Sequence, residues 1–436
     1  MSPDIHRPTN MQKRPARLAR SQTWAFLSIA TLCTALACSN LLDVKAPDAI
    51  GTGSLEVPEN AGLLVNSAIG DFYCAYGSYV VASGLMSGEL QETTLTASRW
   101  SYDRRDIASN ETAYSTDDCT SLGTYTPIST ARFTADHALG LLEGWTDDSV
   151  PNRQELIAQV ATFGGYNRIL LGEGFCAAAI ALGPQLSSNQ IFQLAILKFD
   201  TAITAAQAAG NDSIVNLALV GRARAKLNAG DKAGAATDAA LVPSGFEAAL
   251  SYDAATDYRS NRVFSENNGH GVTVSPHYDT LSSTDPRIKV MDAGRLAADE
   301  QTPLFLQKKY ADGSSSILLA SYTEAQLILA EATGGPGAIP ILNTLRSTIS
   351  GLAPLPASSD AAVIASDIAH ERAAWLWLQG THLFDVRRLG LPLIPAADLD
   401  YSTAYNKGGK YGSETCMPIP DVETNNNPNA HNPPTG

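Results

Sequence analysis

The chain has 436 residues, of which 44% are hydrophobic and 17% charged, and its formal net charge is −14. This apolar content is enough for one large domain or for two or three smaller ones. An acidic surface repels phosphate backbones and anionic head groups, so the composition argues against nucleic acid as a partner.

The first 37 residues have the pattern of a secretion signal. A basic stretch without acids, Met11–Gln22, precedes an apolar run of 15 residues, Thr23–Ala37. The run is shorter than the roughly 20 residues that a bilayer-spanning helix needs. It ends in small residues directly before Cys38, as at a cleavage site. Met1–Asn10 resembles an upstream extension, and the pattern fits a start at either Met1 or Met11.

Cys38 decides between two kinds of export. A cysteine at the new N-terminus can carry a diacylglycerol, and several acyl chains on one residue make a firm membrane anchor. We therefore predict a lipoprotein: residues 1–37 removed, Cys38 lipidated, 38–58 a tether and 59–436 a single domain. The alternative is ordinary cleavage and a free secreted protein, since Ala35 occupies the place where lipid attachment prefers Leu.

Apolar periodicity predicts a mainly α-helical fold. Residues 59–92 carry helical signals, whereas 93–126 and 243–316 are irregular excursions with room for a few short strands. Long irregular segments of this kind are often functional. The predicted later helices are 128–143, 153–182, 190–209, 214–228, 232–242, 322–333, 338–350 and 361–382.

The helices within 153–242 form candidate repeat units. The last two, 214–228 and 232–242, are joined by the turn Ala229-Gly230-Asp231, and small residues such as Gly221 and Ala235 stand where two helices must approach closely. The pattern resembles a tetratricopeptide unit of two helices in about 34 residues. The two preceding helices can form a second unit, and together the pairs would build a superhelical body.

Four cysteines besides Cys38 remain after the signal: Cys74, Cys119, Cys176 and Cys416. An even number in an exported chain favours disulfides, and four thiols allow three pairings. Two of them, Cys74 and Cys119, flank a loop, so we expect these two to pair and the other two to pair by elimination. Buried free thiols are the alternative.

No motif for catalysis, metal or cofactor binding stands out. His370-Glu371 invites comparison with zinc proteases, but the second histidine would have to stand at Ala374. We expect Glu371, Arg372, Asp385, Arg387 and Arg388 to form structural ion pairs instead. The sequence therefore predicts no enzyme, no metal and no cofactor, although a pair of carboxylates for glycoside cleavage needs no motif.

Aromatic residues gather in the two irregular excursions. An aromatic face suits stacking on a sugar ring or a peptide side chain, and Arg99 would place a guanidinium with five donors beside Trp100 and Tyr102. In the second excursion Tyr278 and Tyr310 are the corresponding candidates. Packing of these rings onto the helical body is the alternative for each of them.

Five segments, taken in order, resemble the SusD/RagB family of cell-surface nutrient-binding lipoproteins. They are Cys38–Val44 with Pro47, the helix pairs of 153–242, Ser321–Ala332 ending in Ala-Glu-Ala, Glu371-Arg372 with Gln379–Gly390, and Pro418-Ile419-Pro420 with Asn427-Pro428-Asn429. Gln379 and Thr381-His382 depart from the family's usual residues, which puts local ion pairing in doubt but not the fold.

The resemblance implies an all-helical body with a loop-built binding face in the half outside the repeats. It also implies an outer-membrane, surface-exposed protein that captures oligosaccharides or peptides and docks as a lid on a TonB-dependent, SusC-like transporter. That placement supports Arg99, Trp100, Tyr102, Tyr278 and Tyr310 as ligand contacts. The rival functions are a secreted glycoside hydrolase and a repeat scaffold for envelope proteins.

Overall fold

The computed structural model describes residues 55–401 and 407–431. The predicted signal (1–37), the lipidation site Cys38 and nearly all of the tether (38–58) lie outside the described residues. The account below concerns the unit Glu56–Gly436. Within the described residues, no helix is both long enough and apolar enough to cross a bilayer.

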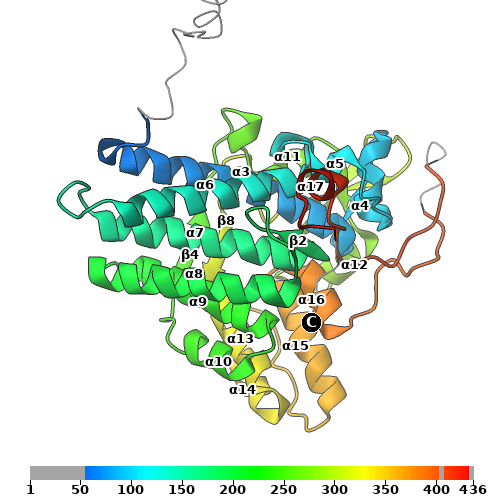
Figure 1. Ribbon diagram of the computed structural model, residues 1–436. Coiled ribbons are helices and arrows are strands. Elements are labelled where there is room, and N and C mark those ends of the chain that lie inside the picture. Colours follow the sequence, from blue (N-terminus) through cyan, green and yellow to red (C-terminus); the bar gives the residue numbers. More distant parts are fainter. Residues whose placement is uncertain (1–54, 402–406, 432–436) are drawn as a thin grey trace, which may run out of the picture. The chain divides into compact units, whose positions relative to one another are not determined.

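Six helices form stacked layers in one half of this unit (Figure 1). The order of packing is α3, α6, α7, α8, α9 and α10, each against the next. Their bounds are α3 Ala61–Met86, α6 Tyr125–Gly144, α7 Arg153–Gly174, α8 Ser188–Ala209, α9 Asp212–Asn228 and α10 Lys232–Ala239. The pairs α7–α8 and α9–α10 are the predicted tetratricopeptide-like units, so the helical, repeat-based fold is confirmed.

Local sequence explains where these helices begin and how closely they pack. Ser187 and Gln190 form a reciprocal capping box at the start of α8, and Asp231 caps α10 through the amide of Gly234. Between the layers, the buried ring of Phe199 fits against Gly165 and Gly221. Glycine lets the helices approach here because any Cβ at either position would collide with that ring.

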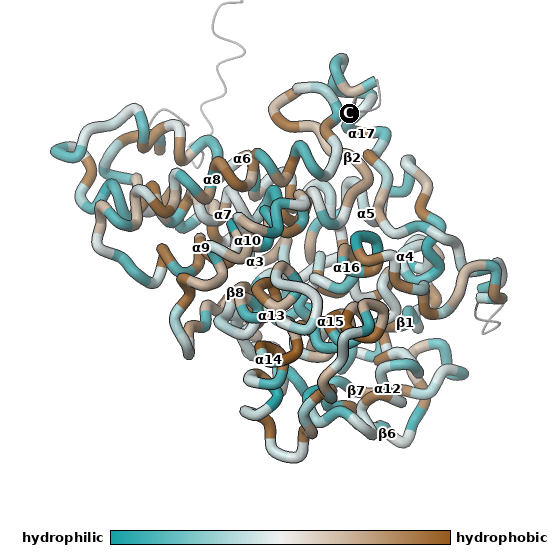
Figure 2. The backbone as a smooth tube through the Cα atoms, turned by 90° about the horizontal axis from the view of Figure 1, so that it is seen from below, coloured by the Kyte–Doolittle hydropathy of each residue, from teal (hydrophilic) through white to brown (hydrophobic). Residues whose placement is uncertain are grey.

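The other half is built from short elements, as the two irregular excursions predict (Figure 2). The strand β1, Leu90–Glu92, directly precedes the first excursion, which holds α4 Trp100–Arg104 and α5 Thr112–Ser115. The second excursion holds β4 Glu247–Leu250, α11 Arg262–Asn268, β5 Val272–Val274, α12 Pro276–Ser282, β6 Val290–Leu296 and β7 Pro303–Gln307. The strands pair two by two: β1 with β5, β4 with β8 (Ile317–Ser321) and β6 with β7, all antiparallel. The β1–β5 pair aligns Leu90 with Val274 and so joins the chain just before the first excursion to the second excursion.

The helix predicted over 153–182 is too long. The structure ends α7 at Gly174 and continues into a small hairpin of β2 (Ala177–Ala179) and β3 (Gln185–Ser187). The reason lies in tertiary contacts: a Cβ at Gly174 would stand 2.6 Å from the ring of Tyr79, and the next residues are held by the C-terminal segment through Phe175 and Met417.

The helix predicted over 361–382 is also too long, because it ends at Trp375. After α13 Tyr322–Thr333 and α14 Gly335–Arg346, the chain forms α15 Ala361–Trp375, breaks, and resumes as α16 His382–Leu389; a last short helix is α17 Asp421–Asn426. The break contains Leu378 and Gly380 with positive φ angles of 55° and 76°. These left-handed residues turn the chain, so α15 and α16 carry different side chains into one place.

The disulfides join Cys74 to Cys119 and Cys176 to Cys416, with Cα–Cα distances of 5.7 and 5.1 Å. This is the pairing that the loop-flanking positions favoured. The first fixes the end of the first excursion to α3, and the second fixes the C-terminal segment to the end of α7. Both therefore tie irregular chain to the helical layers.

Candidate functional site: a histidine-lined pocket

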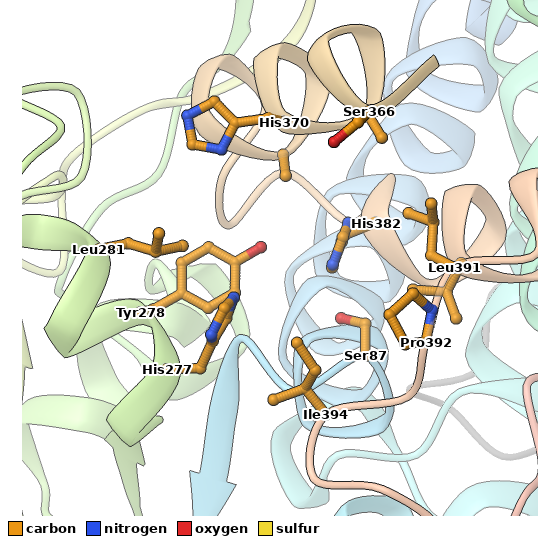
Figure 3. A pocket seen from close by; sticks show the side chains of 13 residues that line it. Ser87, His277, Tyr278, Leu281, Ser366, His370, His382, Leu391, Pro392 and Ile394 are labelled. Atoms are coloured by element: carbon orange, nitrogen blue, oxygen red, sulfur yellow. The ribbon is translucent and has the colours of Figure 1, made fainter. Parts of the chain in front are cut away.

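A pocket of about 270 Å³ opens between α12, α15 and α16. Figure 3 shows His277, Tyr278 and Leu281 on α12, His370 and Ser366 on α15, and His382 at the start of α16, all around one space. Ser87, at the end of α3, and the segment from Leu391 to Ile394 complete the wall (Figure 3). Three of the chain's seven histidines thus meet in one pocket.

Local sequence fixes the helix that forms one wall. Ser275 caps α12 by accepting from the amide of Tyr278, and Pro276 occupies the first turn, where its missing N–H costs nothing. The Ser275 hydroxyl also donates to the carbonyl oxygen of Gly88 at 2.6 Å. The start of α12 is therefore fastened to the end of α3, and His277 and Tyr278 are held at the pocket.

Tyr278 is 2% exposed, yet its hydroxyl points into the pocket (Figure 3). The ring lies nearly parallel to that of Trp377, with centroids 6.0 Å apart and an interplanar angle of 11°. Burial, followed by the nearby carboxylates of Glu89 and Asp385, holds the pKa of Tyr278 well above its usual value. The hydroxyl is therefore neutral and, having no hydrogen-bond partner within the described chain, can donate to a ligand.

The imidazoles of His277 and His382 are also free to bind a ligand. No hydrogen bond within the described residues engages either ring, and Nδ1 of His382 is a buried atom without a partner. Burial lowers the pKa of both, to about 4 for His382, and the neighbouring His370 adds to the effect on His277. Both rings are consequently neutral at pH 7, with one donor and one acceptor each. At His382 the buried Nδ1 is out of a ligand's reach.

His370 is oriented by a carboxylate that does not itself line the pocket. Its Nε2 lies 3.3 Å from Oδ2 of Asp285. Burial alone would raise the pKa of Asp285, but hydrogen bonds from Arg287 and His370 and the charge of Arg287 hold that pKa below its usual range. Because this carboxylate is ionised and paired, the second ring nitrogen of His370 is the one left to face a ligand.

Beside His370, which meets Asp285, the pocket holds the uncharged donors and acceptors of His277, Tyr278 and His382 in an apolar wall. Leu281, Ala369, Ala373, Val386, Leu391, Pro392 and Ile394 supply that wall. Such a combination fits an uncharged, hydroxylated ring. It does not fit a metal ion, because no group of three or more candidate ligands in the described residues has the required arrangement.

A buried ion-pair network behind the pocket sets the positions of α15 and α16. Arg372 on α15 makes two hydrogen bonds to Asp385 on α16, at 2.8 and 2.9 Å. Arg388 joins Asp385 to Glu331 on α13, and Glu371 accepts from Arg287 and Arg346. The predicted structural ion pairs are thereby confirmed except at Arg387, which donates to the carbonyls of Gly172 and Phe175 instead.

The structure places the five residues predicted to contact a ligand in different surroundings. Tyr278 alone lines the pocket. Tyr102 and Tyr310 are buried, 1% and 4% exposed, and their hydroxyls donate to the carbonyls of Leu122 and Leu378, so they present no open face for stacking. Both belong to the core, because burying a ring and bonding its hydroxyl satisfies both ends of the side chain.

Arg99 and Trp100 lie at the start of α4, away from the pocket-lining residues. Arg99 forms ion pairs with Glu92 and Glu266, at 3.2 and 2.7 Å, so its guanidinium is already engaged. Trp100 donates to the carbonyl of Thr94 and is partly exposed. A ligand contact at Trp100 stays a prediction.

Sequence reasoning missed the three histidines. His370 was considered only as a zinc ligand, and His382 only as a departure from a family motif. The signal that could have singled them out is chemical rarity: few histidines occur in the chain, and two of these three fall within the one segment predicted as a helix over 361–382. Their convergence depends on the break between α15 and α16, which periodicity did not predict.

The helical layers and the loop-rich half that carries the pocket define a SusD-like fold. No family model matches the sequence, and no curated protein matches it by sequence comparison. Solved structures do match over most of their length, which confirms the resemblance at the level of the fold.

Three of these neighbours illustrate the match. A SusD homolog from Bacteroides thetaiotaomicron has a TM-score of 0.67 at 13% identity, covering 88% of this chain and 98% of its own. A SusD superfamily protein from Bacteroides vulgatus has a TM-score of 0.64 at 15% identity, covering 86% and 98%. A laminarin-binding SusD-like protein has a TM-score of 0.61 at 15% identity, covering 83% and 96%.

Proposed function

We propose that this protein is a cell-surface lipoprotein that captures an oligosaccharide and passes it to a transporter. The observation that carries the proposal is the pocket, where neutral imidazoles and a tyrosine hydroxyl without partners stand in an apolar wall. Sugar hydroxyls are donors and acceptors of the same kind, and the C–H faces of the ring match the apolar side. The carbohydrate-binding neighbours support the same ligand class.

Capture without chemical change is part of the proposal. Asp285 meets His370 and Asp385 lies near Tyr278, and both carboxylates are held in hydrogen-bonded pairs with arginines. A third carboxylate, Glu89, has a pKa raised to about 7, but it is buried, accepts from the amide of Leu378 and does not line the pocket. A general acid in glycoside cleavage needs a raised pKa, whereas the pKa of both Asp285 and Asp385 is lowered, to about 2 for Asp385. This arrangement favours binding over the rival hydrolase.

Lipid attachment at Cys38 would hold the protein at the outer membrane, and a TonB-dependent, SusC-like barrel would be the partner that receives the ligand. Both steps follow from the family resemblance. Labelling cells with a palmitate analogue tests the anchor: wild type should incorporate the label and Cys38→Ser should not. Co-purification of a barrel from detergent-solubilised membranes tests the partner.

Binding is tested by calorimetry of the mature protein against a panel of oligosaccharides. A sugar that binds wild type should bind Tyr278→Phe and His382→Ala at least about tenfold more weakly, since each loses one hydrogen bond to the ligand and leaves the partner group unpaired. Trp100→Ala shows in the same assay whether that ring also contacts the ligand. Release of shorter sugars during incubation would favour the hydrolase, and no binding by any sugar would favour the scaffold.

A further inference from the structure

A second cavity adjoins the histidine pocket along the same helix. It has a volume of about 510 Å³ and lies between the first turns of α15, the α13–α14 junction at Gly334 and the segment from Leu389 to Pro392. Four residues line both cavities: Ser366, Ala369, Leu391 and Pro392. The two cavities are therefore neighbouring parts of one groove that follows α15.

The two ends of the groove differ in chemistry. One end holds the imidazoles and the Tyr278 hydroxyl. At the other end, the side chains of Ile364, Ala365, Ile368 and Leu389 supply an aliphatic wall. Two charged residues also line this end: the exposed Lys232, and Glu331, whose carboxylate is already paired with Arg388. The aliphatic wall itself contains no aromatic ring on which a sugar could stack and no partner for a hydroxyl group.

We propose that the groove binds an amphipathic glycoside, with a sugar ring in the histidine pocket and an apolar aglycone along Ile364 and Ile368. The inference rests on the proposed glycan-binding function and narrows its ligand class. A plain oligosaccharide would bury hydroxyl groups without hydrogen-bond partners against the aliphatic wall, which is unfavourable. A purely apolar molecule would leave the imidazoles at the other end without partners.

Ser366 and Ala369 explain how one ligand can occupy both ends. They are small residues one turn apart on α15, and they stand where the two cavities meet. A larger side chain at either position would divide the groove. The glycosidic linkage, the narrowest part of such a ligand, fits at this junction.

The decisive experiment measures affinity against alkyl chain length. The probes are the methyl, butyl and hexyl β-glycosides of glucose, galactose, mannose and xylose, kept below micelle-forming concentrations, with 1-hexanol as the chain without a sugar. Each buried methylene contributes about fourfold in affinity when fully desolvated. For the sugar that binds, we expect the hexyl glycoside to bind at least about tenfold more tightly than the methyl glycoside and than hexanol.

A matched pair of variants locates the effect. Ala365 is exposed and lines only the aliphatic end, whereas Ala362 is exposed on the same helix and lines neither cavity. Ala365→Trp should remove the dependence on chain length while methyl glycosides bind as before. Ala362→Trp should behave as wild type, and equal melting temperatures of the two variants show that both are folded.

The outcomes separate this inference from the proposed function. Equal affinity of methyl and hexyl glycosides, or an unchanged chain-length dependence in Ala365→Trp, overturns the amphipathic ligand but leaves glycan capture standing. If no glycoside binds while an oligosaccharide of the panel does, the amphipathic ligand is likewise overturned and glycan capture stands. Failure of both the glycosides and the panel overturns both, and hexanol binding as tightly as the hexyl glycoside makes the groove an apolar site only.

Discussion

Arg372 and Asp385 face each other across the break between α15 and α16 and are joined by two parallel hydrogen bonds of 2.8 and 2.9 Å. Both side chains are almost completely buried. The pair lies between two helices that bring His370 and His382 to the pocket. Its geometry therefore links the stability of the fold to the shape of the site.

Removing one partner of this pair should destabilise the protein strongly. In Arg372→Ala the buried carboxylate of Asp385 keeps only Arg388, so we expect a loss of about 3–5 kcal/mol in the free energy of unfolding. Urea denaturation measures this loss. Arg259→Ala is the control, because Arg259 pairs with Asp253 on the surface and its side chain is 70% exposed, so its loss should stay below about 1 kcal/mol. Similar losses in both variants would contradict the structural role of the buried pair.

The close packing of the helical layers predicts opposite effects of the same substitution at two glycines. A Cβ at Gly165 would stand 2.7 Å from the buried ring of Phe199, so Gly165→Ala should cost about 1–3 kcal/mol through overpacking. Gly140 on α6 has no atom within 4 Å of the corresponding position. Gly140→Ala should stabilise by up to about 1 kcal/mol, since alanine is the better helix former. Thermal unfolding of both variants tests the pair, and a neutral Gly165→Ala would argue against the close approach of α7 and α8.

His382 should make stability depend on pH in a defined window. Burial lowers its pKa to about 4, whereas the unfolded chain takes up the proton near pH 6.5. The unfolded state therefore binds more protons between these values, and the contribution of His382 to stability falls as the pH drops from about 6.5 to 4. His382→Gln should gain stability relative to wild type across this window.

Other buried groups titrate near this window, so the pH dependence of the unfolding free energy of wild type alone would not identify His382. Glu89 and Lys309 are buried groups whose pKa values are shifted to about 7, and they titrate in wild type and in His382→Gln alike. Subtracting the two pH profiles of unfolding free energy isolates His382. A flat difference between pH 6.5 and 4 would mean that the imidazole is protonated as easily in the folded protein as in the unfolded chain.

The two disulfides should differ in what their loss costs. They close loops with sequence separations of 45 and 240 residues. On the chain-entropy model these loops correspond to about 4 and about 5.5 kcal/mol. We expect Cys416→Ser to lower the unfolding free energy more than Cys119→Ser does, as measured by urea denaturation without reductant. The reverse order would show that native contacts around Cys119, and not loop length, dominate.

Much of the fold follows from local sequence. Apolar periodicity and caps such as Ser187 and Asp231 place most helices within a few residues of their observed ends, and Tyr322–Thr333 is matched in full. The helices predicted over 153–182 and 361–382 end earlier than predicted because of tertiary contacts. Gly174 is packed against Tyr79, and Gly380 turns beside the same ring, contacts between residues far apart in the chain.

The site was predictable only in part. Tyr278 stands in a loop-rich excursion, and that context pointed to it. The imidazoles of His277, His370 and His382 come from α12, α15 and α16. The turn at Leu378–Gly380 brings the last two to the same pocket. Conversely, Tyr102 and Tyr310 share the loop context of Tyr278 but are packed inward. Loop context alone does not distinguish a ring that lines a pocket from one that packs in the core.

Ser275 and Asp285 hold α12 from its two sides: Ser275 fastens its start to Gly88, and Asp285, shortly after its end, pairs with Arg287 and meets His370. The seven residues Pro276–Ser282 are therefore fixed at both edges, and the second anchor belongs to the arginine network, because Arg287 also pairs with Glu371. Exchanging the residues between these two anchors would vary one wall of the pocket while the frame that holds it stays in place.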